Sequence, residues 1–232
     1  MHQYTISVNN KTIPIYRFLY EPIDSNMFFI PIGKTGVVFD PNISDDLLQL
    51  FDEYGTKSVQ IILTHEHYDH TTGVEWLQKH IKAPLFCHKD CAHYISSDKG
   101  NSSKLVAFVL SSKDSLDNGH RYEDFMSSYV PYKLKADTIF EEREKLIISY
   151  CSFDCVSTPG HSPGSACYIL DEKYIFTGDS LIQNTPVILR FKESNKTIYE
   201  KYTKPFLNSL DKNMLVFPGH GDPFLLKETK NI

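Results

Sequence analysis

The sequence predicts an α/β protein in which two β-sheets pack together and helices cover the outside. Short apolar stretches typical of strands recur in both halves of the chain, and helical patterns lie between them. The 232 residues suffice for one well-packed core, and an apolar content of 41% is ordinary for a globular protein. We therefore expect a single domain over residues 1–232.

The first half of the chain begins with three apolar runs, "TIPIYRF", "NMFFIPIG" and "GVVFD", which turn residues separate. This pattern predicts a meander of strands. "SDDLLQLFDEYG" then predicts a helix with Ser44 as N-cap and Gly55 as its end. The strand "SVQIIL", the helix "GVEWLQKHIK" and the strand "APLFC" complete a β-α-β unit.

The second half begins with a less regular stretch at about 97–135, rich in Ser, Lys and aromatic residues, for which we expect a helical insertion or lid. Strands then recur in "KLIISY", "FDCVS", "ACYIL", "YIFTG" and "NMLVF". A helix is expected over roughly 195–210, and Pro205 should limit or kink it.

The composition and the N-terminal segment allow predictions about the location and the partners of the protein. The N-terminal segment lacks a basic region followed by a continuous apolar run, so we expect a cytoplasmic protein without a membrane span. A formal net charge of −5 gives no reason to expect nucleic acid or an anionic membrane as a partner. The five cysteines lack CxxC spacing, which favours reduced, buried thiols. A homodimer stays open.

The stretch "LTHEHYDHTTG" at 63–73 places three histidines and an aspartate within six positions, directly after an apolar run. On extended backbone, side chains two apart point the same way, so His65 and His67 can converge on one ion. Asp69 and His70 are adjacent and must diverge, which suits a second ion beside the first. A helical metalloprotease site would need HExxH, but the fourth position after His65 is Asp69.

Three later segments each place a further potential ligand just after a predicted strand. These are His161 in "STPGHSPGS", Asp179 in "YIFTGDS" and His220 in "LVFPGHGDP". Loops that follow strands are where functional groups tend to lie. Together with the first cluster, these segments predict a metal site.

The set HxHxDH, TPGHSPG, TGD and PGH, in that order, resembles the metallo-β-lactamase superfamily of metallohydrolases, and it spans about residues 37–223. The resemblance implies a four-layer αβ/βα sandwich of two mixed β-sheets, with helices on the outer faces and a two-metal site at one edge. It assigns His65, His67 and His161 to the first metal, Asp69, His70 and His220 to the second, and Asp179 to both. Asp40 would support the ligands from behind.

Nitrogen and oxygen ligands suit zinc, although Fe(II) and Mn(II) are also compatible. The resemblance implies that two divalent ions hold a shared water as hydroxide and polarise the substrate oxygen. Asp69 is predicted to orient this hydroxide and accept a proton after the attack. We therefore expect a hydrolase that acts on a small ester, thioester or lactone.

Three other functions stay open: a phosphodiesterase with the same dinuclear core, an iron-dependent redox protein for oxygen or nitric oxide, and an inactive ligand-binding module. The best-known zinc β-lactamases have Cys, or no bridging carboxylate, where this chain has Asp179. Glyoxalase II is similar around "FTGDSL", but only "FLLKETKNI" follows the last motif, so glutathione thioesters are not favoured. N-acyl homoserine lactonases share the ligand set, which keeps a lactone substrate open.

Substrate contacts are expected in the loops around the metals. Arg190 and Lys192 could bind a carboxylate or phosphate, and they could equally be solvated loop charges. The aromatic residues of the insertion could line an apolar mouth or pack the insertion onto the body: Phe108, Tyr122, Phe125, Tyr129 and Tyr132. "CHKDCAH" matches no common zinc pattern and is predicted to be a strand-to-helix junction, and Asp222 is predicted to be a turn residue that supports His220.

Overall fold

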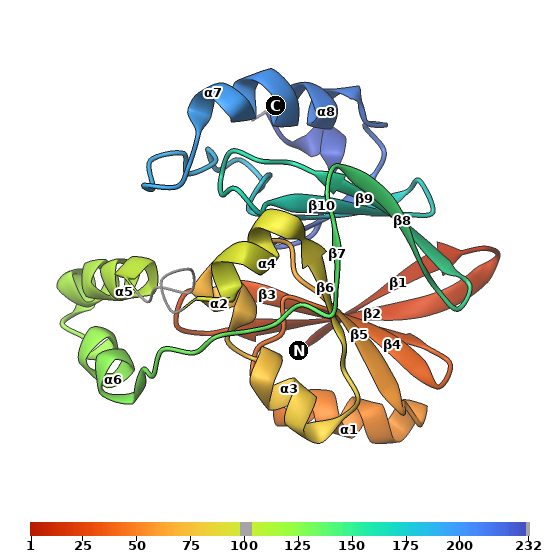
Figure 1. Cartoon of the computed structure of the whole chain (residues 1–232), viewed down its shortest axis with the longest axis horizontal. Coiled ribbons are helices and arrows are strands. Elements are labelled where there is room, and N and C mark those ends of the chain that lie inside the picture. Colours follow the sequence, from red (N-terminus) through yellow and green to blue (C-terminus); the bar gives the residue numbers. More distant parts are fainter. Residues whose placement is uncertain (98–103, 231–232) are drawn as a thin grey trace.

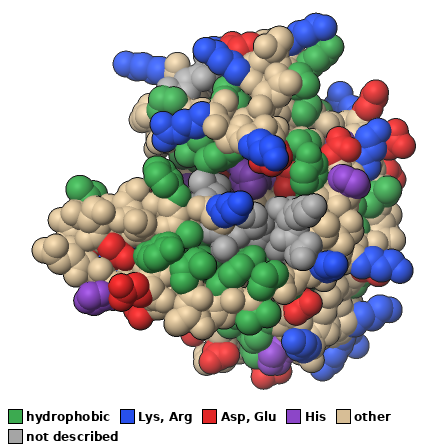
Figure 2. All heavy atoms as spheres, turned by 60° about the vertical axis from the view of Figure 1, so that its left-hand side comes forward, with side chains coloured by type: hydrophobic (Ala, Val, Ile, Leu, Met, Phe, Trp, Pro, Cys, Tyr) green, Lys and Arg blue, Asp and Glu red, His purple; other side chains and the backbone are tan. Residues whose placement is uncertain are grey.

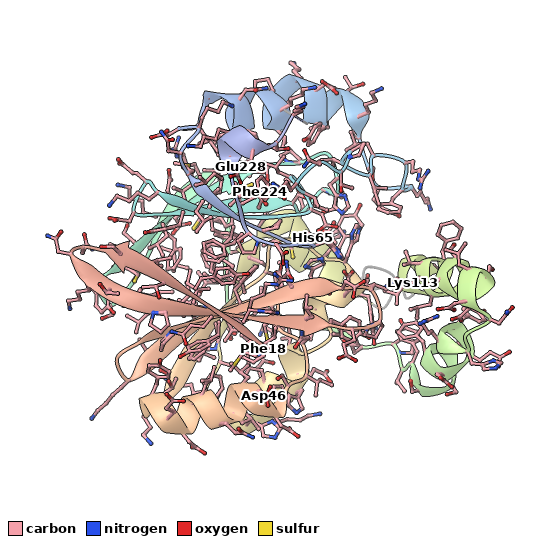
Figure 3. The ribbon with its side chains drawn as sticks, turned by 180° about the vertical axis from the view of Figure 1, so that it is seen from behind. Phe18, Asp46, His65, Lys113, Phe224 and Glu228 are labelled. Carbon is pink, nitrogen blue, oxygen red and sulfur yellow. The ribbon has the colours of Figure 1, made fainter. Side chains whose placement is uncertain are left out.

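Two β-sheets face each other in the computed structural model, which describes residues 1–97 and 104–230 (Figure 1). Helices cover the outer face of each sheet, so the predicted four-layer α/β sandwich is confirmed. Figure 3 labels Phe18 and Phe224, which belong to the cores on the two outer faces, and it shows His65 between the sheets.

The first sheet has the order β1-β2-β3-β4-β5-β6-β7. Its strands are β1 (His2–Val8), β2 (Lys11–Tyr20), β3 (Ser25–Ile32), β4 (Thr35–Phe39), β5 (Ser58–Ile62), β6 (Leu85–His88) and β7 (Thr138–Phe140). Pairing is antiparallel from β1 to β4 and parallel from β4 to β7. The three runs of the predicted meander form β2, β3 and β4, as expected.

The second sheet has the order β13-β12-β11-β10-β9-β8. Its strands are β8 (Arg143–Ile148), β9 (Cys151–Ser157), β10 (Ala166–Leu170), β11 (Tyr174–Gly178), β12 (Leu215–Pro218) and β13 (Phe224–Leu225). β11 and β12 are parallel, and the other neighbours are antiparallel. Both sheets are therefore mixed, as the resemblance implied.

The helices in the first half are α1 (Asp45–Tyr54), α2 (Tyr68–Thr71), α3 (Val74–His80) and α4 (Lys89–Ile95). α1, α3 and α4 bury apolar side chains against the outer face of the first sheet. α1 begins after Ser44 and ends at Gly55, whose φ of 62° is the left-handed conformation typical of a helix end. Ser44 occupies the predicted N-cap position, but its side chain makes no capping hydrogen bond.

α5 (Lys104–Asp117) and α6 (Arg121–Ser128) form a helical hairpin that projects from the sandwich (Figure 1). Arg121 ties the two helices together through Asp114 and Asp117. Lys113, labelled in Figure 3, connects the hairpin to the loop before β3 by donating to Asp24 Oδ2 at 2.9 Å. The hairpin lies within the predicted insertion at about 97–135, of which residues 98–103 are outside the described residues.

The helical run predicted near 195–210 consists of α7 (Lys196–Ile198), the π-helical turn η1 (Tyr199–Thr203) and α8 (Lys204–Ser209), and the 3-10 turn η2 (Leu226–Glu228) follows β13. Pro205 lies in the first turn of α8 and does not end the run. A proline lacks the N–H that an α-helix needs and crowds the preceding turn, and the π turn directly before α8 widens the backbone there. Pro205 therefore marks a change of helical pitch.

All five cysteines are buried and unpaired, as predicted. Among the described residues, no helix has the length and apolar content that a membrane crossing would require.

The main core lies between the two sheets, and Phe39 at the end of β4 is at its centre. Its ring stacks on Phe176 of β11, with centroids 3.9 Å apart and planes within 7°. Phe153 and Tyr168 approach the same ring edge-on, at 5.8 and 5.6 Å. One side chain of the first sheet thus contacts three strands of the second.

Phe39→Ala should lower the free energy of unfolding by about 3–5 kcal/mol, because it opens a cavity where the sheets meet. Denaturant titration of the metal-free protein measures this loss. Phe108→Ala is the control, since Phe108 is 65% exposed on the hairpin and its replacement should change stability by less than about 0.5 kcal/mol. Equal losses in the two variants would contradict the role given to Phe39.

Candidate metal centre

The predicted ligands lie on loops at one edge of the sandwich, where strand ends of the two sheets meet. The loop after β5 carries the first cluster, and the loops after β9, β11 and β12 carry His161, Asp179 and His220. Two hydrogen bonds join the sheets there: Ala166 N donates to Thr64 O at 2.8 Å, and the Tyr168 hydroxyl donates to Leu63 O at 2.7 Å. The sheet packing therefore brings residues from both halves of the chain together.

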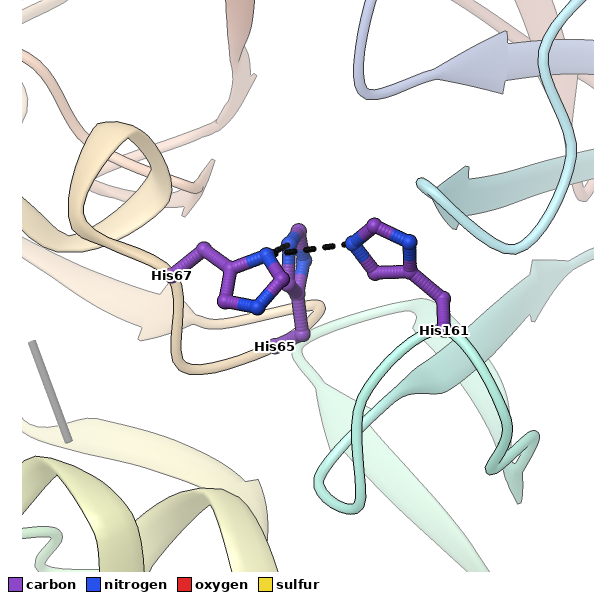
Figure 4. A group of neighbouring side chains, drawn as sticks. All are labelled: His65, His67 and His161. Atoms are coloured by element: carbon purple, nitrogen blue, oxygen red, sulfur yellow. Dashed lines mark hydrogen bonds between the residues drawn. The ribbon is translucent and has the colours of Figure 1, made fainter. Parts of the chain in front are cut away.

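His65, His67 and His161 form one group of converging imidazoles (Figure 4). The Nδ1 atom of His67 lies 3.0 Å from His65 Nε2 and 3.1 Å from His161 Nε2. The rings of His65 and His67 are nearly perpendicular, at 77°. The structure thus brings together the three histidines predicted for the first metal, with a Nδ1 atom from His67 and Nε2 atoms from the other two.

Asp69, His70 and His220 form a second group beside the first. Asp69 Oδ2 lies 3.1 Å from His70 Nε2 and 3.4 Å from His220 Nε2. Asp179 lies between the groups, because its Oδ2 is 3.5 Å from both His161 Nε2 and His220 Nε2. The structure therefore places the carboxylate predicted to bridge the metals next to a residue predicted to bind each of them.

These spacings fit metal ions. A tetrahedral ion with bonds of about 2.0–2.1 Å keeps neighbouring ligand atoms about 3.3–3.4 Å apart. Seven distances between neighbouring donor atoms of the two groups and Asp179 lie between 3.0 and 3.6 Å. His70 Nε2 and Asp179 Oδ1 are buried and have no hydrogen-bond partner among the described residues. Buried polar atoms are rarely left unpaired, so the donor set matches divalent cations.

The three histidines of the first group are held neutral. Burial lowers the pKa of His67 to about 3, with His161 adding to the effect. Burial and the neighbouring His70 lower the pKa of His65 well below its ordinary value, and burial also lowers the pKa of His161. Neutral imidazole is the form that binds metals.

The second group is held in charged pairs. Burial alone would lower the pKa of His70, but the carboxylates of Asp69 and Asp40 outweigh it and raise this pKa well above its ordinary value. Burial is likewise overcome at His220, where Asp179 raises the pKa to about 10. Although burial opposes ionisation of Asp69 and Asp179, the adjacent histidines hold both pKa values well below the ordinary range.

Asp40 orients two of the predicted ligands through hydrogen bonds at their Nδ1 atoms, directly to His70 and through Thr64 to His65. Its carboxylate accepts hydrogen bonds from Thr64 N at 2.7 Å, Thr64 Oγ1 at 2.6 Å and His70 Nδ1 at 2.9 Å. Because the Thr64 hydroxyl donates to Asp40, it is free to accept from His65 Nδ1 at 3.1 Å. Because Nδ1 of each ring is held in this way, both histidines direct their Nε2 atoms at the site. Asp40 adopts φ = 48°, which aspartate tolerates better than most residues.

The loop at 181–195 completes the surroundings of His161. His161 Nδ1 donates to Ile188 O at 3.0 Å, and Ser194 Oγ donates to His161 O at 2.6 Å. Phe191 presents its edge to His67 and His161, with centroids 5.5 and 5.7 Å away. Arg190 and Lys192 flank Phe191 and are exposed, so the structure places them on the loop that contacts the ligands, and their substrate role stays a prediction.

Two glycines allow the loops to approach closely. A Cβ at Gly219 would lie 2.2 Å from Asp179 Oδ1, and a Cβ at Gly178 would lie 2.4 Å from Thr64 Oγ1. Gly178 also has φ = 48°. Side chains at either position would push the carboxylate or the first loop out of place.

Glu66 lies next to the predicted ligands, but the sequence analysis did not select it. It appeared there only within the "HE" of the HExxH pattern, which this chain does not complete. It is buried, and it accepts hydrogen bonds from Ser162 Oγ at 3.0 Å and Gly164 N at 3.3 Å, which ties the first loop to the loop of His161. Burial raises the pKa of Glu66 to about 7. A buried carboxylate with a structural role leaves no periodic signal in a sequence.

The remaining candidates are the "CHKDCAH" segment, Asp222 and the aromatic residues of the insertion, whose place at a substrate mouth stays a prediction. Asp222 pairs with Arg17, and its support of His220 stays a prediction. "CHKDCAH" spans the junction of β6 and α4, where the His88 side chain accepts a hydrogen bond from Asp90 N at 3.2 Å as the N-cap of α4. The aromatic residues of the insertion partly surround Tyr68, which contacts Phe125, Tyr129 and Tyr132 at centroid distances of 5.4 to 5.9 Å. Histidine side chains reach the surface in a hollow, and hydrophobic side chains cover part of the surface nearby (Figure 2).

Asp40→Ala should weaken metal binding roughly 10–100-fold, because His65 and His70 lose the contacts that orient them. Competition with a chromophoric chelator measures the affinity. Asp154→Ala is the control, since Asp154 pairs with Arg143 on the second sheet, and it should bind metal like the unaltered protein. Unchanged affinity in Asp40→Ala would show that the ligands do not depend on this carboxylate.

Comparison with known proteins agrees with this geometry. Residues 20–220 match the family model described as "Metallo-beta-lactamase superfamily". The chain is 26% identical over 208 residues to "Probable metallo-hydrolase YqgX" of Bacillus subtilis. These aligned residues make up 86% of each protein. It is 24% identical to "Hydroxyacylglutathione hydrolase" of Rhodospirillum rubrum, over 85% of this chain and 62% of that protein.

Among solved structures, the fold is similar to that of the BLEG-1 B3 metallo-beta-lactamase, with a TM-score of 0.74 and 23% identity over 92% of this chain and 95% of that one. At this identity the likeness shows the fold alone. The family model, in contrast, matches most of the sequence, including the loops that carry the seven predicted ligands. The chain belongs to the metallo-β-lactamase superfamily.

Proposed function

We propose that this chain is a dinuclear metal hydrolase, with zinc as the expected metal, that acts on a small ester, thioester or lactone. The observation that carries the proposal is the convergence of seven histidine and aspartate side chains into adjoining groups at one edge of the sandwich. Membership of a superfamily with metallo-hydrolase relatives supports a metal-dependent hydrolase. A cytoplasmic location, a small-molecule substrate and a single domain over 1–232 stay predictions.

His65, His67 and His161 would hold one ion, Asp69, His70 and His220 the other, and Asp179 would contact both. Two ions bound there would supply a water nucleophile at neutral pH and stabilise the negative charge that develops on the substrate oxygen. The protein's contribution would be to direct the Nε2 atoms of His65, His70 and His161 at the ions, since a hydrogen bond at Nδ1 fixes each of these rings.

Asp69 is our candidate for proton handling. Its side chain is only 4% exposed, and the neighbouring His70 and His220 keep it ionised. An ionised carboxylate can orient a water molecule by accepting its hydrogen bond and can receive its proton during the attack. The Ser25 hydroxyl donates to Asp69 O at 3.1 Å, which restrains the backbone that carries the carboxylate.

Within this proposal a thioester is one candidate substrate class, since one relative that the chain covers to 62% is named a hydroxyacylglutathione hydrolase, while glutathione itself is not favoured as the thiol. Tyr68, Phe125 and Tyr129 next to the site would suit an apolar acyl or alkyl group. Phosphodiester hydrolysis is the alternative that the same ligand set would serve.

The first test is elemental analysis of protein purified without chelator, together with assays on thioesters, lactones and phosphodiesters. We expect close to two zinc ions per chain and one reactive ester class. Iron without hydrolysis would indicate a redox protein, and absence of bound metal would indicate a ligand-binding module; either result would overturn the proposal.

His65→Ala and Asp179→Ala should each lose bound metal and hydrolysis together, because each removes a ligand from the converging groups. Metal content and turnover are measured on the same preparations. His80→Ala is the matched control: His80 lies on the exposed end of α3, where its Nδ1 donates to Trp76 O, and metal and activity should persist. Full activity in either ligand variant would refute the assignment.

A further inference from the structure

Asn26, near the start of β3, makes three hydrogen bonds to the loop that carries His220. Its side-chain Nδ2 donates to Pro218 O at 2.9 Å and to Gly221 O at 2.8 Å. Its backbone N donates to Gly219 O at 2.7 Å. Asn26 therefore contacts the carbonyls on both sides of His220.

The orientation of this amide follows from its partners. Both are backbone carbonyls, which only accept hydrogen bonds, so the NH₂ end of Asn26 must face them. The other end, Oδ1, is buried and has no partner among the described residues. Leaving a buried acceptor unpaired raises the free energy of the folded state. The amide therefore stabilises the loop through its NH₂ group at the expense of a hydrogen bond to its own Oδ1.

The residues on either side of His220 have further contacts, whereas the carbonyls of Gly219 and Gly221 accept hydrogen bonds from Asn26. Gly219 N donates to Gly178 O at 2.8 Å, which fixes the residue before His220. Arg17, which is 5% exposed, pairs with Asp222 and holds the chain two residues after His220. Gly221 between them has φ = 80°, and a Cβ there would meet nothing within 4 Å.

The neighbouring Ser25 extends the contact to a second ligand. Its hydroxyl donates to Asp69 O at 3.1 Å, and its backbone forms an antiparallel bridge with His220. The first group of histidines has different supports, which are Glu66 on the loop of His161 and Ile188 on its Nδ1. The start of β3 thus contacts residues predicted to bind the second metal, and the hydrogen bonds of the described residues connect it to none of the first group.

We propose that Asn26 is a positioning residue for the second metal ion, and that it sets whether the chain holds one ion or two. This inference rests on the proposed dinuclear function. Metal sites lose roughly 10–100-fold in affinity when a residue that orients a ligand is removed. The second ion should therefore bind weakly without the Asn26 amide, whereas the first should bind as before.

The decisive variant is Asn26→Asp, which keeps the size of the side chain but replaces the NH₂ donor with an acceptor that faces two carbonyls. Gln60→Glu is the matched control. The Gln60 amide also donates to two carbonyls, Pro84 O at 2.8 Å and Ile61 O at 3.1 Å, but it contacts neither metal group through these bonds. Asn26→Ala serves as a second variant if the aspartate prevents folding.

Metal-free protein is titrated with Co²⁺, and the visible absorption and the bound metal after dialysis are recorded. We expect two equivalents in the unaltered protein and in Gln60→Glu. In Asn26→Asp, the first equivalent should bind normally and the second roughly 10–100-fold more weakly, with recovery at excess Co²⁺. A misfolded protein would not recover in this way.

Two equivalents of unchanged affinity in both Asn26 variants would overturn the inference and leave the proposed function intact. Equal weakening of both equivalents would also overturn it, because a general loss of stability would then explain the result. Failure of the unaltered protein to bind a second equivalent would instead overturn the proposed dinuclear function, and the inference with it.

Discussion

The stack of Phe39 on Phe176 holds the two sheets together, and the candidate metal centre depends on that contact. His65, His67, Asp69 and His70 follow a strand of the first sheet, whereas His161, Asp179 and His220 follow strands of the second. A shift of one sheet against the other would change every distance between these two sets. Phe39 is the last residue of β4 and directly precedes Asp40, so the same short segment packs the core and orients two ligands.

The site concentrates polar groups that a structure optimised for stability alone would avoid. Asp40, Asp69 and His70 are each less than 5% exposed, and two buried polar atoms at the centre have no hydrogen-bond partner within residues 1–97 and 104–230. Burying charges is unfavourable unless they are paired. The chain pairs them with one another and holds them through Thr64, Ser25 and Ile188, which leaves the converging atoms arranged for an external cation. Buried polar groups that lower stability are found mainly at functional sites, and in this chain they lie at the candidate metal centre.

Much of this arrangement could be predicted from the sequence. Strands such as "GVVFD" and "YIFTG" are apolar runs bounded by turn residues, and each candidate ligand follows such a strand, so the fold and the set of converging residues were both predictable. The supporting residues were not. Asn26 lies at the start of an apolar strand, and Glu66 lies between two histidines. Neither position has a pattern that distinguishes a residue that holds a loop from an ordinary polar residue. Their partners at 162, 164, 218 and 221 are distant in sequence, so only the folded chain brings them together. The π turn before Pro205 likewise depends on how the helix packs.

The origin of the ligands in both halves of the chain has a consequence for the order of events during folding. His65 and His220 become neighbours only after the two sheets have docked, and contacts between residues far apart in sequence form late, because closing long loops is entropically unfavourable. A partly folded chain that contains the "HEHYDH" segment alone can offer a metal ion only some of its ligands. A complete set of ligands therefore requires both sheets in place, and an ion that binds only the folded chain would shift the folding equilibrium toward it by mass action.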